Sequence, residues 1–261
     1  MHKPDFWGLL GEADRKDLIA VARSRVFPPA GILCTQGEPT THVFILQSGW
    51  VKILTDTSDG RRTLEALRRP GEIVGEIAGQ VTGYRTATVQ ALGTVHALLA
   101  GTRQLGDFLD SHPVAAQAYR QAMAEVQQVA YEKQRSRDLL SGAQRLAGLL
   151  LDLTEPPTLT KRQPGPPGQH GGANGDAAAL QFLLSQEELA SLIGASRSTV
   201  TRALQGWRSR HIIGTDQRRI QILDRARLRR IADRGSGGPS LARGKPVALS
   251  NTSHERGPLG R

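Results

Sequence analysis

The chain has 261 residues, a length that allows one large domain or two of ordinary size. Hydrophobic residues make up 38% of it and aromatic residues 4%, with no apolar run long enough for a transmembrane helix. The one cysteine, Cys34, excludes an internal disulfide framework and any zinc or iron–sulfur site that needs several thiolates from the chain. Because the N-terminus also lacks the apolar core of a secretory signal, we expect a cytoplasmic protein.

The charge balance indicates a polyanionic partner. There are 34 Lys and Arg residues against 24 Asp and Glu, which gives a formal net charge of +10 at pH 7. Residues 234–261 hold five basic residues and one acidic residue, so this segment supplies +4 and residues 1–233 carry +6. The body of the protein is moderately basic, as expected for a protein that binds nucleic acid.

Two segments rich in Pro and Gly interrupt the chain. Residues 155–176 contain five prolines and a glycine cluster, and no regular element continues through such a composition. Residues 235–261 are mostly Gly, Pro, Ser and Arg, with too few apolar residues to bury, so they predict a disordered tail.

The N-terminal part predicts one helix, 6–25, followed by an all-β barrel or roll. Between residues 26 and 100, short runs rich in Val, Ile, Leu and Thr recur at close spacing, and turn-forming residues bound each of them. The expected strands are 43–46, 49–55, 63–67, 85–92 and 94–99.

A long helix is predicted next, over residues 114–140, because this stretch contains no Gly or Pro and follows Pro113, which suits a first helical turn. Small and apolar side chains recur on it at three- and four-residue spacing and form a narrow seam. The seam residues are Ala118, Ala122, Val126, Val129 and Lys133. Such a helix suits pairing with its twin in a homodimer; the alternative is a helix packed on its own domain.

The order of elements in the C-terminal third predicts a winged helix-turn-helix. We expect a helix over 143–153, a short strand over 180–184, helices over 186–193 and 197–210, a hairpin over 212–223 and a final short helix. Ser185 opens a capping box, Gly194 suits a left-handed turn, and Ser196 caps the second helix. Val200 and Leu204 would face inward, which leaves cations and hydroxyls outward for a DNA groove. The alternative is a helical hairpin that only packs, with its arginines solvated.

From residue 6 to about 232 the chain resembles a transcription factor of the catabolite activator and fumarate–nitrate regulator (Crp/Fnr) family. The most specific stretches are 184–190, 194–204 and 70–91. The resemblance implies an α+β fold: an N-terminal β-roll, which is a jelly-roll-like cyclic nucleotide-binding domain, a long dimerisation helix and a C-terminal winged helix-turn-helix. We expect these domains at 1–112, 113–140 and 141–233, with a linker at 155–179 and a disordered basic tail at 234–261. The implied partners are double-stranded DNA with a palindromic operator, a cyclic nucleotide and RNA polymerase, with no membrane.

A Gly-Glu pair and an Arg-Thr pair predict an anion site inside the roll. A cyclic phosphate needs backbone donors, a fixed cation and an acceptor for the ribose hydroxyl. Glu76 would accept from the ribose 2′-hydroxyl, and Arg85 with Thr86 would hold the phosphate oxygens. The close backbone approach and the amide donors would come from Gly75, Ile77 and Ala78. A plain salt bridge between Glu76 and Arg85 is the alternative.

These residues resemble the family's phosphate-binding cassette, which implies cyclic AMP as the ligand. In cyclic AMP-binding relatives a Thr-Ser pair in the dimer helix contacts adenine, and the matching positions here are Ala130 and Tyr131. Tyr131 is able to stack on a base, so purine binding follows from the resemblance, whereas selectivity for adenine does not.

The resemblance also implies which residues contact DNA. Arg197 and Arg202 match the family's base-reading arginines, whose guanidinium suits guanine. Many members place a glutamate after the first arginine, where this chain has Ser198, so readout of the adjacent cytosine does not follow. Arg218 is expected at the wing tip. The predicted set is Ser196, Arg197, Ser198, Thr199, Thr201, Arg202 and Arg218.

Two other functions remain as alternatives. The first is a Crp/Fnr-type regulator whose roll is ligand-independent or binds a different small effector, and the second is an interaction module that only dimerises. The chain shows no phosphate-loop lysine motif, nucleophile elbow or zinc-protease helix, so we do not expect an enzyme. Its seven histidines show no metal-ligand spacing, so no metal is expected.

Overall fold

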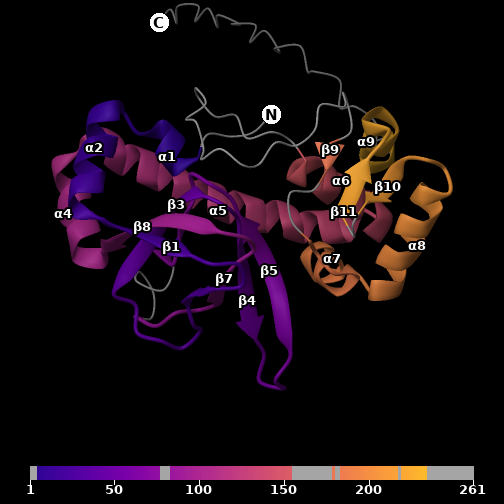
Figure 1. Ribbon diagram of the computed structural model, residues 1–261, viewed down its shortest axis with the longest axis horizontal. Helices are drawn as coiled ribbons and strands as arrows, with labels where there is room; N and C mark the ends of the chain where they lie inside the picture. Colours follow the sequence, from indigo (N-terminus) through magenta and orange to yellow (C-terminus); the bar gives the residue numbers. More distant parts are fainter. Residues whose placement is uncertain (1–4, 77–82, 155–177, 180–182, 217–218, 234–261) are drawn as a thin grey trace, which may run out of the picture.

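The computed structural model describes residues 5–76, 83–154, 178–179, 183–216 and 219–233. Figure 1 shows a β-roll and a smaller, mostly helical domain, with one long helix that extends from the first to the second. Among these residues, no helix combines the length and the apolar character that crossing a membrane requires.

Two short helices precede the roll, so the prediction of a single helix over 6–25 is wrong. They are α1 (Phe6–Leu9) and α2 (Glu12–Val21), and strand β1 (Arg23–Phe27) already begins where the predicted helix should end. Leu10 and Gly11 adopt extended backbone between the helices, and Gly11 serves as the N-cap of α2. The break lets Phe6 and Leu18 both reach the core, where each is 0% exposed.

The roll consists of two four-stranded antiparallel sheets, ordered β1-β8-β3-β6 and β2-β7-β4-β5. The other strands are β2 (Ile32–Cys34), β3 (His42–Ser48), β4 (Val51–Asp56), β5 (Arg62–Arg68), β6 (Ile73–Val74), β7 (Thr88–Ala91) and β8 (Val95–Gly101). The five predicted runs correspond to β3, β4, β5, β7 and β8, which confirms the β-roll. Strands β1, β2 and β6 were not predicted because each is short or buries few residues.

The core of the roll lies between the two sheets. Phe27 and Phe44 meet edge to face there, with ring centroids 6.0 Å apart. Val51, Val89 and Val95 pack in the same cluster. A second apolar cluster lies under α1, α2 and an unpredicted helix, α4 (Thr102–Ser111).

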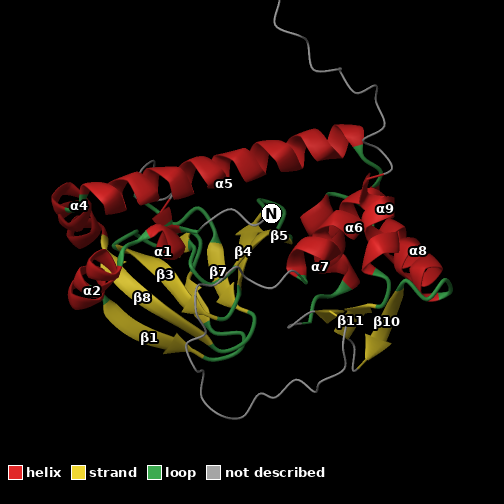
Figure 2. Cartoon of the chain, turned by 90° about the horizontal axis from the view of Figure 1, so that it is seen from above, coloured by secondary structure: helices red, strands yellow, loops and turns green. Residues whose placement is uncertain are grey.

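Helix α5 (Pro113–Leu139) matches the predicted long helix and runs past both domains (Figure 2). Its N-terminal part packs on the roll, where Ala118 is 4% exposed and Tyr119 meets Phe6 edge to face. The predicted seam therefore packs within the protomer at Ala118, and at its other end Lys133 contacts the roll through Glu65. Towards the C-terminus, Val129 and Leu139 are exposed.

The C-terminal domain is a winged helix-turn-helix, as predicted. Its elements are α6 (Gly142–Leu153), β9 (Ala178–Ala179), α7 (Gln186–Ile193), α8 (Arg197–Arg208), β10 (Ile213–Asp216), β11 (Arg219–Ile222) and α9 (Arg225–Asp233). The strands form one sheet ordered β10-β11-β9. The predicted strand at 180–184 lies mostly outside the described residues, and its last two residues, Leu183 and Leu184, belong to no strand.

The two domains contact each other where β4 and β5 meet α7. Leu54 and Leu64 of the roll form an apolar cluster with Leu192 of α7. Beside it, Lys52 of β4 forms an ion pair with Glu188 of α7. Helix α5 also contacts β5 near this boundary, since Lys133 Nζ donates to the carbonyl oxygen of Glu65 at 2.6 Å.

Candidate ligand cavity and nucleic-acid interface

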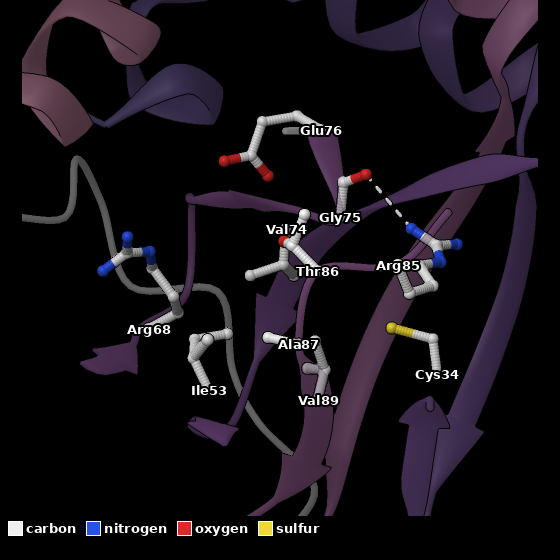
Figure 3. A pocket seen from close by; sticks show the side chains of 10 residues that line it. All are labelled: Cys34, Ile53, Arg68, Val74, Gly75, Glu76, Arg85, Thr86, Ala87 and Val89. Carbon is white, nitrogen blue, oxygen red and sulfur yellow. Dashed lines mark hydrogen bonds between the residues drawn. The ribbon is translucent and has the colours of Figure 1, made fainter. Parts of the chain in front are cut away.

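A small cavity inside the roll brings together several of the predicted ligand residues (Figure 3). Its volume of about 60 Å³ is well below the roughly 300–1,000 Å³ of typical ligand pockets, so a nucleotide needs the cavity to open. The lining residues are Cys34, Ile53, Arg68, Val74, Gly75, Glu76, Arg85, Thr86, Ala87 and Val89.

Arg85 places a buried guanidinium in this cavity. Its Nη1 donates to the carbonyl oxygen of Gly75 at 3.1 Å and its Nη2 to that of His42 at 2.7 Å, while the group lies 5.4 Å from the ring centre of Phe44. The residue is 3% exposed. In the part of the chain that the structure describes, no ion pair joins Glu76 to Arg85. A buried positive charge held by neutral carbonyls is suited to an anion.

Gly75 is required by the close approach of Arg85 to the backbone. Its φ is +86°, and a Cβ at this position would lie 2.2 Å from Arg85 Nη1. Thr86 is exposed at the cavity rim. Ile77 and Ala78 lie outside the described residues, so their amide donors stay a prediction.

Glu76 is a buried carboxyl on the cavity wall, 4% exposed. Burial raises its pKa above the usual range, and the positive charges of Arg68 and Arg85 offset part of this rise. A hydrogen bond from a ribose hydroxyl would compensate for lost hydration of such a group.

Arg68 lines the same cavity, and sequence reasoning missed it. A β-bulge at Glu65 breaks the alternation of β5, because Ala66 pairs with Ile53 while Leu64 pairs with the next residue, Leu54. Without the register of β4 against β5, no sequence signal shows that this arginine faces the interior.

Cys34 lines the cavity, whereas Tyr131 does not. Burial raises the pKa of the Cys34 thiol, which therefore stays protonated. Tyr131 is 65% exposed on α5 and is not among the cavity-lining residues. Within the described ranges, no group of three or more His, Cys, Asp or Glu could hold a metal ion.

The helix-turn-helix has the local geometry that the sequence predicts. Ser185 Oγ accepts from the amide of Glu188 at 3.1 Å, and the Glu188 carboxylate accepts from the amide of Ser185 at 2.8 Å. Gly194 adopts the left-handed region with φ at 61°. Arg145 of α6 also holds the turn, since its Nε donates to the carbonyl oxygen of Ile193 at 2.7 Å. This contact was not predicted.

Helix α8 presents its arginines outward. Val200 and Leu204 are 0% and 1% exposed and face the core, whereas Arg197 and Arg202 are exposed. This is the arrangement that reading a major groove requires.

The hydroxyl groups near the start of α8 bond mostly within the protein. Ser196 Oγ accepts from the amide of Thr199 at 3.2 Å and lies 2.9 Å from Ser198 Oγ. Ser198 itself is exposed beside this cap. Thr201 donates to Gln186 Oε1 at 2.6 Å and is half-buried. Arg218 lies outside the described residues.

Both halves of the chain match known domain families. Residues 24–112 match the cyclic nucleotide-binding domain, and residues 144–231 match the Crp-like helix-turn-helix domain. The chain is 29% identical to the CRP-like cAMP-activated global transcriptional regulator of Mycobacterium tuberculosis over 207 residues, which are 79% of this chain and 86% of that protein. It is 22% identical to the cAMP-activated global transcriptional regulator CRP of Salmonella typhimurium over 197 residues, covering 75% and 87% of the two chains.

Two solved structures share the fold. The c-di-GMP responsive global regulator CLP of Xanthomonas campestris superposes with a TM-score of 0.63 at 17% identity, covering 81% of this chain and 99% of its own. A mutant of CooA from Carboxydothermus hydrogenoformans has a TM-score of 0.60 at 17% identity, covering 83% and 90%.

The β-roll, the long helix and the winged helix-turn-helix define a DNA-binding regulator with a cyclic nucleotide-binding domain. The chain belongs to the Crp/Fnr family of transcription regulators. This membership agrees with the predicted family and with the expectation that the protein is not an enzyme.

Proposed function

We propose that the protein is a homodimeric transcription regulator that binds a cyclic nucleotide in its roll and a palindromic operator through α8. The observation that carries the ligand part is the buried guanidinium of Arg85, which is held by two neutral carbonyl oxygens. Cyclic AMP is the first candidate, because the relatives from Mycobacterium and Salmonella are named as cAMP-activated regulators.

The cyclic phosphate would bind the guanidinium of Arg85. A charge-assisted, bidentate contact with phosphate oxygens is stronger than the two neutral bonds that Arg85 now makes. Thr86 at the rim would add a hydroxyl donor, and Glu76 would accept from the ribose. The amides of Ile77 and Ala78, which the sequence predicts as donors, would complete this site.

The dimer is supported by α5, whose exposed apolar side chains include Val129 and Leu139. In a dimer, Tyr131 would lie within reach of the partner and of a bound base. Two-fold symmetry then presents two copies of α8 to successive major grooves, about 10 to 10.5 base pairs apart. A regulator of this kind acts in the cytoplasm, where it meets both DNA and RNA polymerase.

Calorimetric titration with cyclic AMP and cyclic GMP tests the ligand part, and selection from a random duplex pool with and without ligand tests the DNA part. We expect heat with a cyclic nucleotide, and selected sites with an inverted repeat whose binding strengthens when ligand is present. Absence of heat with retained DNA binding would favour the ligand-independent alternative. Absence of sequence selection would favour the module that only dimerises.

A further inference from the structure

Arg68 lies on the inner face of the roll among apolar side chains. It pairs directly with Val51 across β4 and β5, and Val51 pairs with Ala91 across β4 and β7. Directly opposite residues in antiparallel strands project to the same face of the sheet. Because Val51 and Ala91 are 0% and 2% exposed and belong to the core of the roll, Arg68 projects to the interior as well.

Among the residues that the structure describes, the contacts of Arg68 use only part of its hydrogen-bonding capacity. Its Nη1 donates to the carbonyl oxygen of Leu67 at 3.3 Å, and its Nε lies 3.8 Å from Glu72 Oε2, which is too long for a hydrogen bond. A guanidinium has five N–H donors in a fixed fork, and neither contact is bidentate. The side chain is 18% exposed and lines both this cavity and a larger groove between the roll, α5 and the C-terminal domain, so part of this capacity faces the cavity.

Figure 3 shows Arg68 and Arg85 on opposite sides of the cavity, with Thr86 between them and the Glu76 carboxylate on the Arg68 side. A single cyclic phosphate that binds Arg85 therefore does not also occupy the fork of Arg68. The ligand needs a second group for this arginine.

We propose that Arg68 binds a second pair of acceptor atoms on the ligand, across the cavity from the phosphate held by Arg85. Two kinds of group present such a pair to a guanidinium fork: O6 and N7 of a guanine, and the oxygens of a second phosphate. Adenine presents N7 beside the N6 amino donor, so cyclic AMP satisfies the fork only in part. The inference rests on the proposed function and refines which cyclic nucleotide the site selects.

Four ligands separate the two sources of the acceptor pair. Cyclic AMP has neither guanine nor a second phosphate, cyclic GMP has the guanine alone, cyclic di-AMP has the second phosphate alone, and cyclic di-GMP has both. Each is titrated calorimetrically into the full-length wild type and two variants. Arg68→Gln removes the fork, and Arg69→Gln is the matched control, because Arg69 also pairs with Glu72, at 3.5 Å, but does not line the cavity.

We expect the wild type to bind at least one ligand with the second acceptor pair more tightly than cyclic AMP. Arg68→Gln should weaken that ligand about ten- to a hundredfold, as expected for a lost charge-assisted pair, and weaken cyclic AMP by a clearly smaller factor. Retained cyclic AMP binding also shows that the variant folds. The ligand that loses affinity identifies the group, guanine or second phosphate, that Arg68 contacts.

Two results overturn the inference: a wild type that prefers cyclic AMP, or an Arg68→Gln variant that weakens all four ligands by the same factor as Arg69→Gln. A wild type that binds none of the four while still binding DNA defeats the proposed ligand function itself. The two failures are therefore distinguishable.

Discussion

Ser191 and Leu64 are joined by two hydrogen bonds across the domain boundary. Ser191 Oγ accepts from the amide of Leu64 at 3.1 Å and donates to its carbonyl oxygen at 3.0 Å. Among the described strands, β5 lies at the edge of its sheet, so no described strand pairs with these backbone groups. The first helix of the helix-turn-helix therefore takes the place of a strand at this point.

Replacing Ser191 by Ala should destabilise the protein by about 1–2 kcal/mol, because it leaves a part-buried donor and acceptor unpaired. Urea unfolding of the wild type and the variant measures this difference. The control is Ser209→Ala, at an exposed hydroxyl that donates only within its own helix end, and it should change stability by less than about 0.5 kcal/mol. Equal effects of the two substitutions would contradict this account of the contact.

The ion pair between Lys52 and Glu188 should make stability depend on pH. Burial acts to raise the pKa of Glu188, but hydrogen bonds from Lys52 and Ser185 outweigh it and hold the pKa below the usual range. A depressed carboxyl pKa stabilises the fold above the ordinary glutamate pKa, and this contribution is lost as the pH falls through the folded-state pKa.

Glu188→Gln isolates the charge, because glutamine also completes a capping box. The difference in unfolding free energy between wild type and this variant should be largest near neutral pH and shrink as the medium is acidified. Glu187→Gln, which removes a charge at the exposed neighbouring position, is the matched control. A pH-independent difference for Glu188→Gln would rule out a contribution from this ion pair.

Arg85→Ala should weaken cyclic nucleotide binding about ten- to a hundredfold, since it removes a bidentate charge-assisted contact. The affinity of Arg85→Lys should lie between those of the wild type and Arg85→Ala, because lysine keeps the charge but not the fork. Calorimetric titration measures both, with Arg62→Ala as a control at an exposed ion pair outside the cavity. Unchanged affinity in Arg85→Ala would mean that the phosphate binds elsewhere.

Replacing both Val126 and Val129 by Lys should convert dimers into monomers, because four like charges then meet in the paired helices. Analytical sedimentation reports the change. Gln121→Lys, at an exposed position of the same helix, should leave the dimer intact. An unchanged dimer in the double variant would place the interface on another surface.

Arg197→Ala and Arg202→Ala should each cost about 1–3 kcal/mol of DNA binding and relax the preference at one base pair. Arg218→Ala should instead weaken all sequences alike and lower the salt slope by about one, as expected for a phosphate contact. Binding to a panel of single-base operator variants at several salt concentrations separates these outcomes. A uniform loss in all three variants would argue against base reading by α8.

Ser198→Glu should restrict the choice of base at one operator position where the wild type tolerates several bases. Glutamate accepts a hydrogen bond from cytosine N4, whereas serine does not enforce cytosine. Sites selected from a random pool by the two proteins provide the comparison. Identical preferences would show that position 198 does not face the bases.

The sequence by itself determined the features that depend on neighbouring residues. The capping box at Ser185, the left-handed turn at Gly194 and the inward face of α8 follow from short-range rules, and the structure has all three. The long helix and the main strands of the roll were predicted for the same reason, because their hydrophobic patterns repeat over several residues. The single helix expected over 6–25 failed because packing of Phe6 and Leu18 against the roll outweighs local helical propensity.

Only the tertiary structure decided where Arg68 projects and what covers the edge of β5. Arg68 reaches the cavity because a bulge at Glu65 shifts the register of β5 against β4, and a one-residue shift moves side chains to the opposite face. Ser191 and Leu64 are 127 residues apart, and no local pattern encodes their contact. Such contacts depend on how separate elements pack, which the periodicity of each element leaves undetermined.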